Sequence, residues 1–317
     1  MWFKNLCVYR LAEPFAWSAE GLADKLAEFG FQPVARTETV SRGWVPPLGR
    51  GAESLVHSSG GRIMICLQEE QRLLPPTVVR ETLDERVAER EESEARKLGR
   101  REKARMKDEI TLELLPRAFT RSRRSYAYID TREGFVVVDS GTWRAAEELT
   151  ELLRESLGSL PLRPLQTVSN PQRVMTEWLG QDDTPGDIEL GDEAVLEDPD
   201  NEGAEVRVKR QDLQSAEIQG HIRAGKHVRR LAVTWNERMQ CVIDTDLSVK
   251  RLKFLDSVQD EAGDREAETD AERFDADFTI MTLELGRFLP RLLAWFDGES
   301  GTEGSTSASA ETGSAAS

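Results

Sequence analysis

The residues of this chain best suited to chemistry are lysines and arginines, which gather in short clusters. Residues 96–107 hold seven basic side chains against the single acid Glu102, and residues 117–124 hold four arginines and no acid. Such side chains bind phosphate groups, and affinity for DNA rises with the number of phosphates neutralised. A run of charges is also typical of a plain solvated face, and both interpretations stay open here. Charge alone suggests further DNA-binding candidates in three later clusters: Lys209, Lys226, Arg229, Arg230, Lys250, Arg251 and Lys253.

The surroundings of these clusters indicate which features of DNA they could recognise. The sequence contains no helix-turn-helix or zinc-finger signature, so it does not indicate base-specific readout. No ladder of aromatic residues interleaves with the basic ones, so stacking on single-stranded bases has little support. If the clusters bind DNA, contacts to its sugar-phosphate backbone should dominate.

Catalytic and metal-binding groups are sparse. The chain has no GxGxxG, GxxxxGK[ST] or GxSxG motif. His221 and His227 have no cysteine or carboxylate at ligand spacing, which favours surface histidines over a metal site. Asp275 and Asp277 could hold Mg²⁺ only if they shared a face, and we expect them instead at a helix N-terminus, where carboxylates cap amides. The sequence therefore predicts no catalytic residue, no metal and no cofactor.

The charge is unevenly distributed along the chain. The 317 residues carry a net charge of −16, which taken alone argues against a nucleic-acid partner. Residues 177–205, 256–277 and 298–317 together hold 25 acids and two bases, which leaves a net charge of +7 on the rest. We therefore expect a basic body with acidic segments outside it, able to turn a basic face toward a polyanion.

Features of the sequence point to the cytoplasm. No run of 18 apolar residues could span a membrane, and the N-terminus lacks the basic region and cleavage site of a secretory signal. Cys7, Cys66 and Cys241 lie far apart in apolar, strand-like segments. This spacing favours buried free thiols over disulfides.

The periodicity of apolar residues predicts a mixed α+β fold. Residues 43–49 should form a rigid loop, and Ser18 should cap the first helix. The predicted helices span residues 18–29, 143–157, 171–179, 212–224 and 276–296. The predicted strands span residues 1–10, 62–67, 126–130, 135–139, 205–209, 228–235, 239–244 and 249–255.

These elements divide the chain into several subdomains. An N-terminal α/β subdomain is predicted from residues 1–74 together with 125–165, and a C-terminal α/β subdomain with acidic inserts from residues 166–297. The Ser/Gly/Thr/Ala-rich tail, residues 298–317, is predicted to be disordered.

Residues 75–124 are predicted to form a projecting helical hairpin whose helices join near Gly99. Its tip is almost wholly charged, so it cannot be buried in its own subunit but could reach a second one. Phe119 follows the hairpin in a basic neighbourhood. It could anchor a partner surface or pack beneath its own hairpin, and the sequence does not choose between these positions.

Eight short segments together resemble the RdgC family, the recombination-associated proteins of Gram-negative bacteria. They occur in the family's order up to about residue 296, and each is only modestly specific. The departures are the stretches around 181–203 and 260–272 and the tail, which look like variable loops. The segments are WFKNLCVYRL (2–11), GWVPPLG (43–49), LLPRAF (114–119), SLGSLP (156–161), KRQDL (209–213), HIRAGK (221–226), KRLKF (250–254) and FDADF (274–278).

The resemblance implies a ring-shaped homodimer with duplex DNA passing through a basic central hole. It implies nonspecific DNA binding, nucleoid association, a role in replication-linked recombination and restraint of the RecA recombinase, with single-stranded DNA as a further candidate partner. By residue, Phe119 matches the family's aromatic at a subunit contact, and Arg117 precedes it in the same motif. Arg210 and Gln211 match a basic–polar pair beside the DNA path.

Two alternatives remain open at this point. The chain could regulate the recombinase by protein–protein contact, with acidic segments such as 177–205 mimicking DNA toward a basic partner. It could instead be a metal-dependent nuclease that uses Asp275 and Asp277. The first alternative predicts inhibition that survives loss of the basic clusters, and the second predicts Mg²⁺-dependent cleavage.

Overall fold

The structure is a computed structural model that describes residues 1–317 except 50, 182, 202, 264–268 and 301–317. Most of the tail predicted to be disordered therefore lies outside the described residues. Its first residues are bonded to the body of the protein. The Gly298 carbonyl accepts a hydrogen bond from Val168 N at 3.0 Å, and the Glu299 carboxylate pairs with Arg10 and Arg163. The prediction of disorder is thus wrong for residues 298–300.

The first sheet is antiparallel, with strand order β2–β4–β5–β6–β1–β7, and β3 also pairs with β4. Two helices, α1 (Ala19–Ala27) and α4 (Trp143–Leu157), pack on one of its faces. Ser18 caps α1 as predicted, accepting a hydrogen bond from Gly21 N at 3.1 Å. The strands are β1 (Cys7–Leu11), β2 (Val40–Val45), β3 (Val56–Ser59), β4 (Arg62–Leu73), β5 (Phe119–Asp130), β6 (Phe135–Val138) and β7 (Leu162–Pro164).

The strands β4 and β5 are longer than predicted and pair along their whole length, from Arg62 opposite Asp130 to Leu73 opposite Phe119. Their outer halves carry polar and charged residues without apolar alternation, so periodicity could not reveal them. Backbone hydrogen bonds between the strands, rather than a buried face, form this part of the sheet. Residues 43–45 of the predicted loop likewise belong to β2, where Trp44 is buried and donates to Ser156 Oγ at 2.9 Å.

The second sheet is also antiparallel, with the order β12–β11–β10–β8–β9. Its strands are β8 (Ile188–Glu197), β9 (Glu205–Lys209), β10 (His227–Trp235), β11 (Met239–Asp244) and β12 (Val249–Phe254). The acidic stretch around 181–203, expected to be a variable loop, contains β8, which lies between β10 and β9. Buried residues such as Ile188 and Leu196 hold β8 in the core while its acids face outward.

Four helices accompany the second sheet in the described residues: α5 (Pro171–Gln181), α6 (Ala216–Arg223), α7 (Asp256–Gly263) and α8 (Asp270–Ala294). The helix predicted from residue 276 begins at Asp270, because Thr269 and Glu272 form a capping box. Asp275 and Asp277 therefore lie in the second turn, and the prediction that they cap the helix is wrong.

A shared hydrophobic core joins the two sheets. It includes Phe3 and Tyr128 from the N-terminal half and Phe278 and Phe288 from α8. The N-terminal segment also bonds directly to the second sheet, since Leu6 N donates to the Val249 carbonyl at 2.7 Å. Helix α8 and residues 1–6 therefore connect the two sheets.

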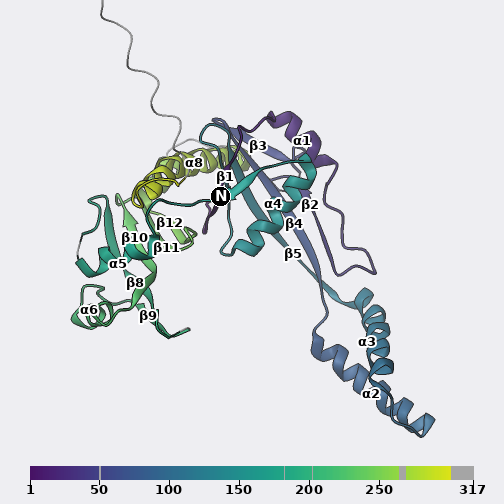
Figure 1. Ribbon diagram of the computed structural model, residues 1–317. Coiled ribbons are helices and arrows are strands. Elements are labelled where there is room, and N and C mark those ends of the chain that lie inside the picture. The colour runs from purple at the N-terminus through teal and green to yellow at the C-terminus, as the bar shows by residue number, and fades with distance from the viewer. Residues whose placement is uncertain (50, 182, 202, 264–268, 301–317) are drawn as a thin grey trace, which may run out of the picture.

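Helices α2 (Pro76–Glu94) and α3 (Arg100–Leu114) lie at the outer end of β4 and β5, followed by the short 3₁₀ helix η1 (Leu115–Arg117). They pack on each other around a small core that includes Val79, Met106 and Ile110. Gly99 precedes α3 as its N-cap, so the helices join where predicted. Figure 1 shows an arch: the first sheet and α8 form its top, the second sheet descends at one end, and α2 and α3 extend at the other.

Candidate nucleic-acid interface

Several basic residues predicted on the second sheet are paired with acids of the same sheet and its loops. The Lys226 ammonium lies 2.8 Å from the Asp198 carboxylate. The Arg229 guanidinium lies 3.0 Å from Glu197 and 2.9 Å from Glu205. All three acids come from the acidic stretch 177–205, so this stretch offsets part of the charge that Lys226 and Arg229 could present to DNA.

Asp244 on β11 forms ion pairs with two of the cations predicted to bind DNA. Arg230 Nε lies 2.6 Å and Lys250 Nζ 2.7 Å from its Oδ2, and the Asp244 side chain is only 5% exposed. Burial raises the pKa of Asp244, but hydrogen bonds from Lys250 and Arg230 outweigh burial and hold the pKa below its usual range. Arg251 on β12 is engaged as well, in an ion pair with Glu193.

The low pKa of Asp244 predicts a loss of stability in acid. A carboxylate whose pKa falls on folding stabilises the protein above its unfolded pKa of about 3.9, and this contribution is lost as pH falls through the folded value. The melting temperature of wild type should therefore exceed that of Asp244→Asn at neutral pH. The difference in melting temperature should disappear below about pH 4 in a series of thermal unfolding curves from pH 7 to pH 2.5. The exposed control Asp24→Asn should follow wild type throughout. A constant gap for Asp244→Asn would contradict this assignment.

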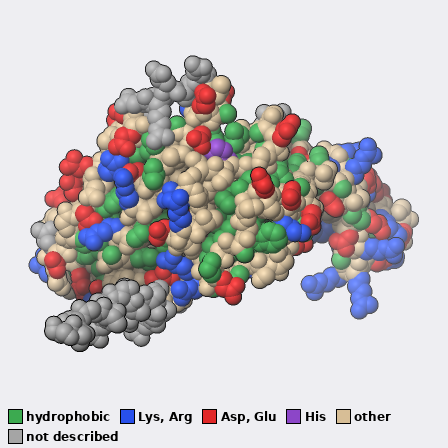
Figure 2. All heavy atoms as spheres, turned by 90° about the horizontal axis from the view of Figure 1, so that it is seen from above, with side chains coloured by type: hydrophobic (Ala, Val, Ile, Leu, Met, Phe, Trp, Pro, Cys, Tyr) green, Lys and Arg blue, Asp and Glu red, His purple; other side chains and the backbone are tan. Residues whose placement is uncertain are grey.

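The expected separation of a basic body from acidic segments does not hold on the second sheet. There the acids of residues 177–205 lie within ion-pair distance of the bases. Figure 2 likewise shows acidic and basic side chains interspersed over the convex face, with basic side chains standing out at the end formed by α2 and α3. Cations that lack an acid partner in the structure are therefore better candidates for contacts with DNA than cations chosen only by counting charges along the sequence.

Lys209, Arg210 and Lys253 have no acid partner among the described residues, and all three are exposed. Lys209 ends β9, an edge strand of the second sheet, and Arg210 follows with a left-handed φ of 52°. The neighbouring Gln211 is held in place, because its backbone N bonds the Asp192 carbonyl and its amide donates to Glu217. The Lys209–Arg210 pair thus projects two uncompensated charges from a fixed backbone.

The structure excludes one of the two positions considered for Phe119. Its side chain is 84% exposed, so it does not pack beneath its own hairpin. Phe119 begins β5 opposite Leu73, which is also exposed, as are Val78 on α2 and Leu112 on α3. We call these four residues the junction patch, since they lie where the hairpin joins β4 and β5. Arg117, two residues before Phe119, is exposed and has no acid partner within the described chain.

The carboxylates considered for nuclease chemistry are engaged separately. Asp275 Oδ1 lies 3.0 Å from His57 Nε2, and Asp277 binds the N-terminal amino group. The described residues contain no group of three His, Cys, Asp or Glu side chains that could hold a metal ion. Within the same residues, no helix is long and apolar enough to cross a membrane.

The three cysteines are buried and free, as predicted. Burial raises the pKa of the Cys66 and Cys241 thiols to about 12. A thiol with so high a pKa is protonated at neutral pH and is a poor nucleophile.

Comparisons with known proteins cover nearly the whole chain. The family described as "Putative exonuclease, RdgC" matches residues 1–299. A protein named "Recombination-associated protein RdgC" from Halorhodospira halophila is 52% identical over 299 residues, which is 94% of this chain and 99% of that protein. A protein of the same name from Aeromonas hydrophila is 41% identical over the same shares of the two chains.

The chain belongs to the RdgC family. The resemblance carried by the eight short segments is thereby confirmed. The descriptions differ in emphasis, since the curated relatives are named for recombination and the family description names an exonuclease. Family membership therefore connects the chain with recombination.

Sequence reasoning missed two arginines of this RdgC-family chain that the fold brings beside the 117–124 cluster. Arg42 on β2 lies 2.6 Å from Glu69 on β4, which also pairs with Arg123 of the cluster at 3.0 Å. Arg144 in the first turn of α4 lies 3.7 Å from Glu148, which pairs with Arg123 of the cluster at 2.6 Å. Both are isolated in the sequence, so no local signal could have identified them.

Proposed function

We propose that the protein binds duplex DNA without sequence preference and acts in recombination. The observation that carries this proposal is the Lys209–Arg210 pair, exposed and without an acid partner in the described chain, beside a sheet in which most other cations form ion pairs. Phosphate contacts of this kind hold DNA through its backbone and carry no base information.

The proposed assembly is a homodimeric ring that encircles the duplex. The second sheet and the α2–α3 hairpin extend from the same side of the arch, which leaves an open concave side (Figure 1). The projecting hairpin of each subunit would close this side against the other subunit, with the junction patch around Phe119 as the contact. A ring without base contacts can slide along DNA, which suits nucleoid association and replication-linked recombination.

In this proposal the ring limits RecA by occupying the DNA that the recombinase needs. The alternative, protein–protein regulation through acidic segments, has less support, because acids such as Glu193, Glu197 and Asp198 are paired within their own chain. A segment that mimics DNA needs its negative charges free for the partner.

We also propose that the protein is not a nuclease, despite the wording of the family description. Asp275 and Asp277 lie two positions apart on α8 and therefore point to different sides of the helix. Their partners differ as well: His57 binds the first, and the N-terminal amino group binds the second. Incubation with supercoiled plasmid and Mg²⁺ should leave the plasmid intact, and cleavage would overturn this part of the proposal.

The main test is fluorescence anisotropy with labelled random duplexes over a salt series. Binding should weaken at least about 100-fold between 50 and 200 mM KCl, since each phosphate contacted contributes a slope of about −0.9 to the double-logarithmic plot. Duplexes of unrelated sequence should give the same dissociation constant. Absent or salt-insensitive binding would overturn the proposal that the protein binds DNA and would favour regulation by protein–protein contact.

A further inference from the structure

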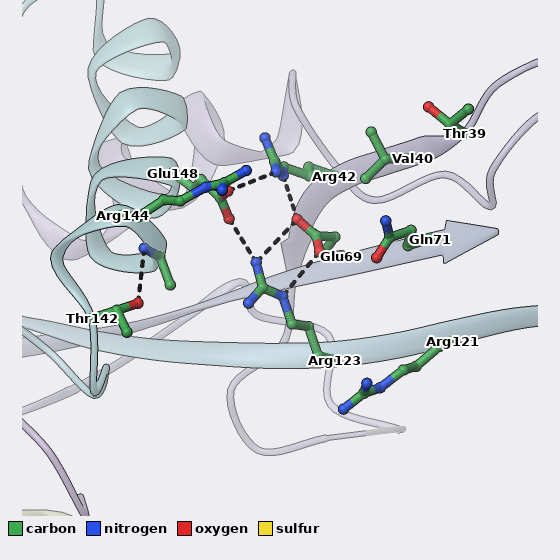
Figure 3. A pocket seen from close by; sticks show the side chains of 11 residues that line it. Thr39, Val40, Arg42, Glu69, Gln71, Arg121, Arg123, Thr142, Arg144 and Glu148 are labelled. Carbon is green, nitrogen blue, oxygen red and sulfur yellow. Dashed lines mark hydrogen bonds and ion pairs between the residues drawn. The ribbon is translucent and has the colours of Figure 1, made fainter. Parts of the chain in front are cut away.

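A depression lies on the first sheet, between the strands β2, β4 and β5 and the N-terminal half of α4 (Figure 3). Strand register places its floor residues on one face: Val40, Gln71 and Arg121 form one row across β2, β4 and β5. Arg42, Glu69 and Arg123 form the next row. Side chains two positions apart on a strand share a face, so both rows point toward the N-terminal half of α4.

The floor of this depression is a closed group of alternating charges, which we call the arginine–glutamate quartet: Arg42, Glu69, Arg123 and Glu148. Arg42 lies 2.6 Å from Glu69 and 3.3 Å from Glu148. Arg123 lies 3.0 Å from Glu69 and 2.6 Å from Glu148. Burial raises the pKa of Glu69, but hydrogen bonds from Arg42 and Arg123 outweigh it and lower the pKa overall. The quartet is therefore neutral as a whole and held in one geometry.

Two further arginines stand at the rim and are not neutralised by the quartet. Arg121 is exposed and has no ion pair among the described residues. Arg144 is 91% exposed and reaches only to 3.7 Å from Glu148, whose oxygens already bind Arg42 and Arg123 more closely. Figure 3 shows Arg121 and Arg144 on opposite sides of Arg123. The rim thus presents two cations across a depression whose floor has no net charge.

The first turn of α4 adds to the attraction of the depression for an anion. Thr142 caps the helix by accepting from Ala145 N, and the N-terminus of a helix carries partial positive charge. Trp143 in the same turn donates to Asp246 of the second sheet at 2.8 Å. The first turn of α4 therefore lines the depression and also contacts the turn between β11 and β12.

We propose that this depression is a binding site for the DNA backbone, in which Arg121 and Arg144 each contact one phosphate. A phosphodiester carries one negative charge and two free oxygens, which one guanidinium group can bind through two hydrogen bonds. The quartet positions the site, because it fixes Arg123 and Glu148 between the two rim arginines. This inference rests on the proposed DNA binding and adds a contact on the first sheet to those on the second.

The test removes the two rim charges while keeping the quartet. The double variant Arg121→Gln, Arg144→Gln is compared with Arg36→Gln, Arg132→Gln, which removes two exposed charges elsewhere on the N-terminal half. In anisotropy with random duplex, the rim variant should bind about 5- to 30-fold more weakly at 100 mM KCl, and its salt slope should be shallower by about 1.8 for each subunit that contacts the duplex. The control should keep the affinity and the slope of wild type.

The outcomes separate this site from the proposed function. If wild type binds duplex DNA and the rim variant matches it in affinity and slope, the phosphate site is wrong while DNA binding stands. If wild type does not bind DNA, both proposals fail. Equal weakening in the rim variant and in the control would also overturn the site, because it would show only a general effect of net charge. Thermal melts of both variants check that these exposed substitutions leave the fold intact.

Discussion

Replacing Phe119 with aspartate should convert the proposed dimer into monomers at concentrations where wild type is dimeric. Phe119 is 84% exposed in the single chain and lies among other exposed apolar side chains of the junction patch. A central aromatic of an interface commonly contributes 2 kcal/mol or more, and a buried charge adds a desolvation cost. The dimer dissociation constant should therefore rise at least about 30-fold. Sedimentation velocity over a concentration series measures this directly.

The control for this experiment is Val168→Asp. Val168 is also a strongly exposed apolar residue, at 65%, but it lies in the segment before α5 rather than in the junction patch. Its substitution should leave the dissociation constant unchanged. A Phe119→Asp variant that sediments like wild type would remove the junction patch from the proposed interface. Both residues are exposed, so neither change should lower the melting temperature appreciably.

Reversing the charges at the end of β9 should have the largest effect on DNA binding. In Lys209→Glu, Arg210→Glu, two uncompensated cations become two anions beside the proposed DNA path. Loss of two phosphate contacts in each subunit should lower the salt slope by about 1.8 per subunit, and repulsion from the new carboxylates weakens binding further. We expect the dissociation constant for random duplex to rise at least about 100-fold at 100 mM KCl.

A matched reversal on the opposite side of the arch separates local contacts from net charge. Lys25→Glu, Arg36→Glu makes the same charge change on and after α1, which packs on the first sheet far from β9 (Figure 1). This variant should bind DNA within about threefold of wild type. If both reversals weaken binding equally, the Lys209–Arg210 contact is not specific. The β9 variant should remain dimeric, whereas Phe119→Asp should not, so the two experiments test separate parts of the ring.

The local sequence was sufficient for elements whose signals lie within a few neighbouring residues. The helix over 143–157 is found with the predicted bounds, because its apolar stripe, its Thr142 cap and its Gly158 end are all adjacent in sequence. The join of the hairpin at Gly99 and the burial of the three cysteines follow from equally local patterns. Each of these features depends on periodicity or on capping, which short segments carry in full.

Other features depended on partners that are distant in the sequence. The acidic stretch looked like a loop, but β8 forms there because β9 and β10 pair with both of its edges and bury its few apolar residues. The outer half of β5 looked like a basic segment after a helix, but β4 pairs with it residue by residue. Backbone pairing between strands can dominate a weak local pattern, and the sequence does not show which strands meet.

The electrostatics of the candidate interface were decided by the tertiary structure alone. Charge counts placed Arg230, Lys250 and Lys209 in equivalent clusters, yet Asp244 forms ion pairs with the first two, whereas Lys209 is exposed and has no acid partner among the described residues. Arg42 and Arg144 have no basic residues next to them in the sequence, and only the packing of β2 and α4 beside β5 brings them to the 117–124 cluster. The sequence thus determined the family, the fold class and the local elements, whereas folding determined which charges remain free, because ion pairing depends on distances of a few ångströms between residues that are far apart along the chain.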